Sequence, residues 1–441
     1  MTPPHVAVVG GGYSGTLQAI QLLDRGARVT LIERADRLAR GVAYSTRHAD
    51  HLLNVRACKM SAFPDPADHF ATWLAGQSEG AENSFAQRRS YGRYLAGLLE
   101  EARNNAGGRL SIVGAEVQDV TAAATGERVE LGRGERIAAD AVVLALGNLP
   151  PETPRGISAD SLADGIFHAD PWSADLAAGL DANDTILLVG TGLTAIDAAL
   201  ILDSAGFGGR ILALSRRGLL PRAHAEQSSG STALDCIPAT ECTDLLRFVR
   251  AVSEQVGWQA AVDSLRPVTQ AIWAGAGLAE RQRFLRHLRP WWDVHRHRIA
   301  PSIAARVEKM IAQGRLEVAA GKIISVKAAD RAALLRWRPR GRTSEESVEV
   351  RRIVNCTGPQ SDITRAGEPL LDALLSAGRI RPDPCRIGVH VDQQCRTISA
   401  AGPSQTLRAV GPISKGAFWE VVAVPDIRQQ VRDVAEFLIA R

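Results

Sequence analysis

The 441-residue sequence is poor in several residue types, and each shortage narrows the range of functions. It has six cysteines and no Cys-x-x-Cys pair, which argues against a zinc ribbon, an iron–sulfur centre and a dithiol flavin reductase. No apolar run reaches the ~18 residues of a membrane span, and the N-terminus lacks the charged and apolar regions of a signal peptide. We therefore expect no membrane partner and a cytoplasmic location with free thiols.

The chain also lacks a strong charge of either sign, since 52 Lys+Arg against 48 Asp+Glu give a net charge of +4 without a basic or acidic tail. Segment 334–343 alternates arginine with other residues, which fits a nucleic-acid ribbon or, better, a hairpin strand with a solvated arginine face. His295 and His297 cannot share a helix face. We therefore expect neither a nucleic-acid partner nor a metal site.

A strand–turn–helix–strand pattern opens the chain. Short apolar runs at Val6–Val9 and Val29–Ile32 indicate buried parallel strands, with apolar residues at helical spacing between them. The turn carries Gly-x-Gly-x-x-Gly, whose glycines let backbone N–H groups and the helix N-terminus approach a pyrophosphate. An acid that follows the second strand can accept hydrogen bonds from ribose hydroxyls. The predicted FAD-binding residues here are Gly10, Gly12, Ser14, Gly15 and Glu33.

The same pattern recurs in the middle of the chain, with strands at Ile186–Val189 and Ile211–Leu214. Ser215 occupies the position of the acid, and two arginines follow it. A carboxylate there would repel a 2′-phosphate, whereas guanidinium groups attract one. The pattern favours NADPH over NADH, although two surface arginines in an arginine-rich protein are an alternative. The predicted NADP(H)-binding residues are Gly190, Gly192, Ala195, Ser215, Arg216 and Arg217.

Both units continue into strand pairs and then into a strand that ends in Leu-Gly or Thr-Gly. This repetition predicts an α/β fold with two Rossmann-like dinucleotide-binding domains, the NAD(P)H domain being inserted into the FAD domain. We expect the FAD domain over residues 1–175 and 350–441. The NAD(P)H domain is expected over 176–349, with a helical insertion at about 239–315.

Two further regions are candidates for the reaction site. Residues 41–74 are rich in polar groups and could wrap the flavin, build a substrate pocket or form a surface loop. The candidate substrate contacts are Arg56, Lys59, Trp291 and Trp292.

Near the C-terminus, Gly411 is a further candidate for FAD binding, and Ala417–Glu420 opens a helical pattern. The N-terminus of that helix could face the pyrimidine edge of the flavin, or the segment could be only the last turn and helix of the domain.

At these residues the chain resembles a bacterial FAD/NAD(P)-binding flavoprotein family that is related to flavin monooxygenases. The resemblance covers nearly the whole chain and is carried by the motifs GVAY, HLLNV and MSAFPD, by the second glycine motif with SRRG, and by a late GP-x3-G-x2-WE motif. These stand at Gly41–Tyr44, His51–Val55, Met60–Asp65, Gly190–Gly218 and Gly411–Arg428. Many flavoproteins of the wider superfamily have Gly-Asp where this chain has Gly411-Pro412, so an expected contact to the flavin ribityl chain is missing.

The resemblance implies an FAD-dependent NAD(P)H:O2 monooxygenase that hydroxylates a small polar metabolite, with urate to 5-hydroxyisourate as the named expectation. The flavin would carry the chemistry, so no nucleophilic side chain is expected. A flavin-dependent NAD(P)H reductase or dehydrogenase, an N-hydroxylating monooxygenase on another substrate, and a non-catalytic FAD/NADP(H)-binding redox sensor all share these motifs and stay open.

Overall fold

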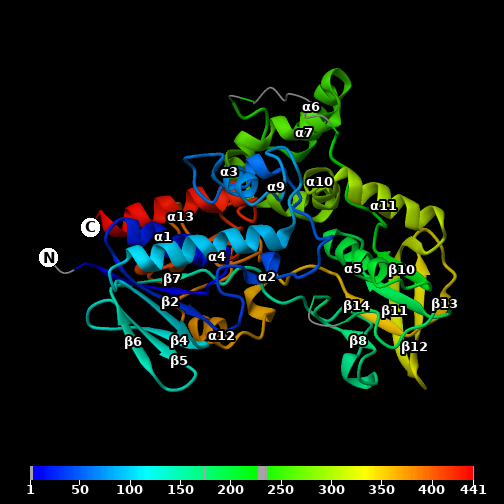
Figure 1. The fold of residues 1–441 in the computed structure, drawn as a ribbon, viewed down its shortest axis with the longest axis horizontal. Helices are drawn as coiled ribbons and strands as arrows, with labels where there is room; N and C mark the ends of the chain where they lie inside the picture. Colours follow the sequence, from blue (N-terminus) through cyan, green and yellow to red (C-terminus); the bar gives the residue numbers. More distant parts are fainter. Residues whose placement is uncertain (1–2, 173–174, 227–233, 235, 441) are drawn as a thin grey trace.

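The computed structural model describes residues 3–172, 175–226, 234 and 236–440. Two sheets flanked by helices lie side by side, with a group of further helices above them (Figure 1). The two ends of the chain build one sheet and the middle builds most of the other. The predicted α/β fold with an inserted second domain is confirmed.

The first sheet has six strands in the order β15-β16-β7-β1-β2-β3, and all neighbours are parallel except β15 and β16. Pairing of β16 with β7 returns the C-terminal part of the chain to the sheet begun at the N-terminus. The strands are β1 (His5–Val9), β2 (Arg28–Glu33), β3 (Leu110–Gly114), β7 (Ala141–Leu144), β15 (Arg396–Ser399) and β16 (Gly402–Ala409).

Alternate residues of these strands face two different layers. Val6 and Val8 pack with three helices on one face, and Ala7 and Val9 pack with a small antiparallel sheet and one helix on the other. The first layer contains α1 (Tyr13–Asp24), α4 (Arg88–Asn105) and α13 (Val424–Ile439). The second contains β4 (Val117–Ala122), β5 (Glu127–Leu131), β6 (Arg136–Ala139) and α12 (Pro369–Ser376).

The second sheet has the order β13-β12-β11-β10-β9-β14-β8, and its parallel part is covered on one face by α5 (Leu193–Ser204) and α11 (Pro301–Ala312). Arg336 and Arg338 alternate with buried Leu335 and Trp337, which confirms a hairpin strand with a solvated arginine face. The strands are β8 (Phe167–His168), β9 (Thr185–Val189), β10 (Arg210–Ser215), β11 (Leu316–Ala329), β12 (Ala332–Pro339), β13 (Glu346–Val350) and β14 (Arg352–Asn355).

The inserted helices pack near the C-terminal segment of the first domain rather than beside the second sheet alone (Figure 1). Trp273 stacks on Trp419 at 4.8 Å between ring centroids, and its Nε1 donates to Gly416 O at 2.9 Å. These helices are α6 (Cys242–Val256), α7 (Trp258–Ser264), α8 (Thr269–Gly275), α9 (Leu278–Arg283), a π-helical turn (Phe284–Leu288) and α10 (Arg289–Arg296).

The structure differs from the sequence-based expectation at two places. Strands β8 and β14 lie just outside the expected 176–349 range yet pair with the second sheet. The helix expected from Ala417 begins only at Val424, because residues 417–422 form turns and Glu420 has φ +72°, which an α-helix does not allow. A run of turns therefore separates the turn Gly411–Ser414 from α13. Among the described residues, no helix combines the length and apolarity that crossing a bilayer requires.

Candidate functional site

The first glycine-rich turn joins β1 to α1 and leaves no room for a side chain at Gly10 or Gly15. Gly10 has φ +100°, and a Cβ there would lie 2.4 Å from Ala145 O; a Cβ on Gly15 would lie 1.8 Å from Gly10 O. The N-cap residue Gly12 has no side chain to cap α1, and within the described part of the chain the first N–H groups of the helix have no other partner, so they can bind an anion. The turn therefore fits the diphosphate of FAD.

Glu33 ends β2 beside this turn. Its Oε2 accepts the N–H of Gly11 at 2.7 Å, and its Oε1 accepts the N–H of Ala35 at 2.9 Å. These bonds fix the carboxylate, and each oxygen keeps a lone pair that can accept a ribose hydroxyl. The predicted role of Glu33 in FAD binding fits this geometry.

The segment after β2 folds back over the first turn. Ala39 donates its N–H to Gly11 O at 2.7 Å, and a Cβ on Gly12 would lie 3.4 Å from Gly41 Cα. Gly41 begins the short helix α2 (Gly41–Tyr44), which carries the GVAY motif. The segment after β2 thus packs closely on the backbone of the first turn.

The return segment reaches the same place. Gly411 has φ +72°, and a Cβ there would lie 2.4 Å from Ser14 Oγ, so the 3-10 turn Gly411–Ser414 packs directly on the start of α1. Gln430 of α13 accepts the Gly411 N–H at 2.7 Å and donates to Ser414 Oγ at 3.0 Å. Pro412 supplies no carboxylate to a flavin ribityl chain, in contrast to an aspartate at this position.

The second glycine-rich turn joins β9 to α5 and is more open. A Cβ on Gly190, which has φ +126°, would lie 2.3 Å from Cys356 O. A Cβ on Gly192 would meet nothing within 4 Å, and Ala195 already carries a methyl group where the first turn has Gly15. The helix start is again free of a side-chain cap.

The residues at the end of β10 that were expected to contact the 2′-phosphate are not equally available to it. Thr191 Oγ1 donates to Leu219 O at 2.6 Å, so its 2.9 Å bond with Ser215 Oγ uses the Ser215 proton. Ser215 therefore has no proton left for a phosphate. Arg216 is exposed and makes no ion pair or hydrogen bond within the described residues, and Arg217 is half-buried with its NH2 3.4 Å from Arg286 O.

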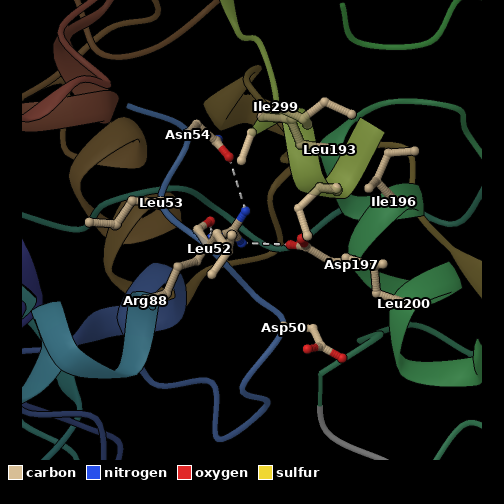
Figure 2. Close-up of a pocket in the computed structure, with 12 residues that line it drawn as sticks. Asp50, Leu52, Leu53, Asn54, Arg88, Leu193, Ile196, Asp197, Leu200 and Ile299 are labelled. Carbon is tan, nitrogen blue, oxygen red and sulfur yellow. Dashed lines mark hydrogen bonds and ion pairs between the residues drawn. The ribbon is translucent and has the colours of Figure 1, made fainter. Parts of the chain in front are cut away.

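A small pocket lies where α5 meets the first domain (Figure 2). Arg88 of α4 points across it and pairs with Asp197 of α5 at 2.6 Å, where the Arg88 side chain is 13% exposed and that of Asp197 is 7% exposed. Arg88 also donates to Leu52 O at 3.0 Å and to Asn54 Oδ1 at 3.4 Å. One ion pair therefore links the two dinucleotide units two residues beyond Ala195.

His51 lies fully buried beside this pair. Its Nε2 is 3.2 Å from Asp197 O, and its Nδ1 is 2.8 Å from Thr46 Oγ1. Burial lowers the pKa of His51, which the charge of Asp197 only partly opposes. The HLLNV motif thus belongs to the contact between the two domains.

The candidate substrate contacts do not converge. Arg56 donates to Asn83 O at 2.7 Å and to Glu226 O at 2.8 Å, while Lys59 is exposed. Trp291 is 44% exposed, and Trp292 donates its Nε1 to Glu420 Oε1 at 2.8 Å. In the described part of the chain, no bond or ring contact joins the two cations to the two tryptophans.

Glu420 is a site residue that the sequence did not single out. Its carboxylate is buried 3.1 Å from Arg296 Nε and 3.6 Å from His297 Nε2. Burial would raise the pKa of Glu420, but the charges of His297 and Arg296 outweigh it, and the pKa is lowered. The signal was the Trp-Glu pair of the late motif, because a charged residue next to a core tryptophan must find a partner.

Comparisons with known proteins agree with this geometry. Residues 7–149 match the family described as FAD-NAD(P)-binding. A 41-residue stretch is 54% identical to the bifunctional protein of tRNA 5-methylaminomethyl-2-thiouridine biosynthesis from Thiobacillus denitrificans. That stretch spans 9% of this chain and only 7% of that protein.

Solved structures match over the full length. The ornithine N-hydroxylase of Kutzneria sp. 744 is 16% identical, with 100% and 99% of the two chains covered and a TM-score of 0.67. The ornithine hydroxylase of Pseudomonas aeruginosa is 14% identical with both chains fully covered and a TM-score of 0.68. The bacillithiol disulfide reductase of Bacillus cereus is 15% identical, also with full coverage, at 0.59.

These matches define the class of fold: a flavoprotein fold with two dinucleotide-binding domains in one chain. The family match confirms that the N-terminal unit is an FAD/NAD(P)-binding domain.

Proposed function

We propose that the chain is an FAD-dependent NAD(P)H:O2 monooxygenase that acts on a small polar metabolite. The observation that carries the proposal is the pairing of a closed glycine-rich turn beside Glu33 with an open one beside Arg216. The first suits a resident FAD and the second a dissociable NADPH. Bound FAD would supply the redox chemistry with O2, while the chain binds, orients and shields the reactants.

The full-length likeness to ornithine hydroxylases supports oxygenation as the reaction class. The disulfide reductases with the same fold support a second candidate, an NAD(P)H-dependent reductase. Cys242 and Cys395 do not suit a thiol mechanism, because burial raises the pKa of Cys242 to about 11 and of Cys395 to about 12. A thiolate is the reactive form, and these sites disfavour it.

The family resemblance makes urate the first substrate to test, and the likeness to ornithine hydroxylases adds L-ornithine. The experiment measures NADPH oxidation and O2 uptake with each compound, followed by mass spectrometry of products formed under ¹⁸O2. Label in a hydroxylated product is expected. Substrate-independent NADPH oxidation with transfer to another acceptor would favour the reductase, and absence of any turnover would favour a redox sensor.

A further inference from the structure

Lys415 places an ammonium group between the two dinucleotide units. It follows directly on the turn Gly411–Ser414, and its Nζ donates to Ser361 Oγ at 2.7 Å. Ser361 lies in the connection that leaves β14. The chain has five lysines, all within the described residues, and Lys415 alone among them is not exposed.

The two connections that meet at Lys415 begin at the two glycine-rich turns. Gly411 packs on Ser14 at the first turn, and Lys415 is four residues further, within ~14 Å even for an extended chain. Cys356 packs on Gly190 at the second turn, and Ser361 is five residues further, within ~18 Å. Lys415 thus lies a short length of chain from both glycine-rich turns, and hydride transfer would require the redox ends of the two dinucleotides to meet between those turns.

The protein does not neutralise this charge by direct contact. No carboxylate of the described residues lies within 4.0 Å of the Lys415 ammonium, and Ser361 offers a hydroxyl without charge. The two acids whose charges act on Lys415 have other partners. Asp293 of α10 lies 3.4 Å from Arg289, and Asp383 accepts the N–H groups of Cys385 and Ile387.

An ammonium has three N–H donors, and here only one of them has an acceptor in the described part of the chain. A half-buried charge with open donors is costly unless an opposite charge pairs with it. Arg289 adds a second positive charge nearby. The Lys415 ammonium can therefore still donate to an anion.

We propose that Lys415 binds the anionic group of a small organic substrate, a carboxylate or a deprotonated heterocycle. The inference rests on the proposed function, because it assigns the substrate class of that same reaction site. It also replaces Arg56 and Lys59 as the cation that recognises the substrate.

The protonation state of Lys415 gives the site a pH dependence. Burial and the charge of Arg289 lower the pKa of Lys415 to about 8, against the opposing charges of Asp293 and Asp383. Anion binding needs the protonated amine, so affinity should weaken as the pH rises through about 8. A bound anion would raise the pKa of Lys415, so the affinity for the anion should fall gradually as the pH rises.

The test is calorimetric titration of the purified flavoprotein at pH 7, which needs no turnover. One pair of probes is urate and the neutral purine hypoxanthine, and the other is L-ornithine and its amide, so that the two pairs separate binding of a heterocyclic anion from binding of a carboxylate. At least one anion should bind. Its affinity should fall about 10- to 100-fold in Lys415→Met, while the exposed control Lys309→Met should keep it.

Lys415→Gln serves as a second variant, because it retains a donor for Ser361 and removes only the charge. The proposal is overturned if both variants bind the anion as the wild type does, or if the wild type binds neither anion. Failure of the proposed function looks different. Anion binding that depends on Lys415 without substrate-stimulated O2 uptake would refute the monooxygenase, and stimulated O2 uptake with unchanged binding in Lys415→Met would refute only this inference.

Discussion

The two glycine-rich turns share a backbone design but differ in what surrounds them. A Cβ on Gly12 would lie 3.4 Å from Gly41, whereas a Cβ on Gly192 would meet nothing within 4 Å. The difference arises from the segment after β2, which folds back over the first turn. Near-identical motifs thus lie in different surroundings, which under the proposed function would let one retain its ligand and the other release it.

The chemistry beside each turn follows the same division. Glu33 is fixed by two backbone N–H groups and suits ribose hydroxyls, while Arg216 is exposed and suits a phosphate that arrives from solvent. These differences support the proposal that the first turn retains its cofactor and the second exchanges its coenzyme.

The largest expected effect is a difference in flavin retention between valine substitutions at the middle glycines of the two turns, Gly12 and Gly192. Gly12→Val should abolish flavin retention, because its branched side chain enters the space between the turn and Gly41. Gly192→Val should keep the flavin and the melting temperature, since its side chain points into open space, but should block the coenzyme. Flavin absorbance after desalting and a thermal melt check both variants. Equal flavin loss in the two would remove the distinction.

Loss of the Arg88–Asp197 ion pair, which joins the two dinucleotide units, should have the next largest effect, a decrease in the free energy of unfolding. Arg88→Met leaves Asp197 buried without its partner, and such a loss costs about 3–5 kcal/mol of unfolding free energy. Denaturant unfolding of the single variants and of Arg88→Met with Asp197→Leu measures the coupling. The double variant should recover much of the stability, and strictly additive losses would show that the pair is not coupled.

Coenzyme selectivity should change by a smaller amount. Arg216→Ala removes a charge-assisted contact worth about 1.5–3 kcal/mol, which corresponds to roughly 10- to 100-fold in kcat/KM for NADPH. The kcat/KM for NADH should stay near the wild-type value, because NADH lacks the 2′-phosphate. The exposed Arg338 provides a matched control as Arg338→Ala. Parallel losses with both coenzymes would contradict the assignment.

The smallest expected effect is a pH dependence at the contact between the domains. The pKa of His51 is lowered by burial, so the folded protein binds fewer protons there than the unfolded chain, whose histidine titrates near 6.5. Stability should therefore be full above that pH and fall on acidification below it. His51→Gln should flatten the drop in melting temperature between pH 7.5 and 5.5. The exposed control His287→Gln should leave the slope unchanged.

Local patterns predicted the fold well, because each dinucleotide unit is specified by glycine spacing and buried strands within about 30 residues. Contacts between distant segments were not predictable in this way. Arg88 and Asp197 stand far apart in the sequence, as do Lys415 and Ser361, and neither pair has a local signature. The prediction that a helix starts at Ala417 was wrong, because Glu420 has φ +72°, which an α-helix does not allow. The side chain of Glu420 contacts Arg296 and Trp292, which lie far from it in the sequence.

Anaerobic mixing with NADPH tests the central claim most directly, namely that the first unit retains FAD and the second admits the coenzyme that reduces it. In the wild type, flavin that survives desalting should bleach on addition of NADPH. In Gly192→Val the flavin should remain bound but bleach far more slowly. Flavin that NADPH does not reduce in the wild type, or that bleaches equally fast in Gly192→Val, would contradict the account.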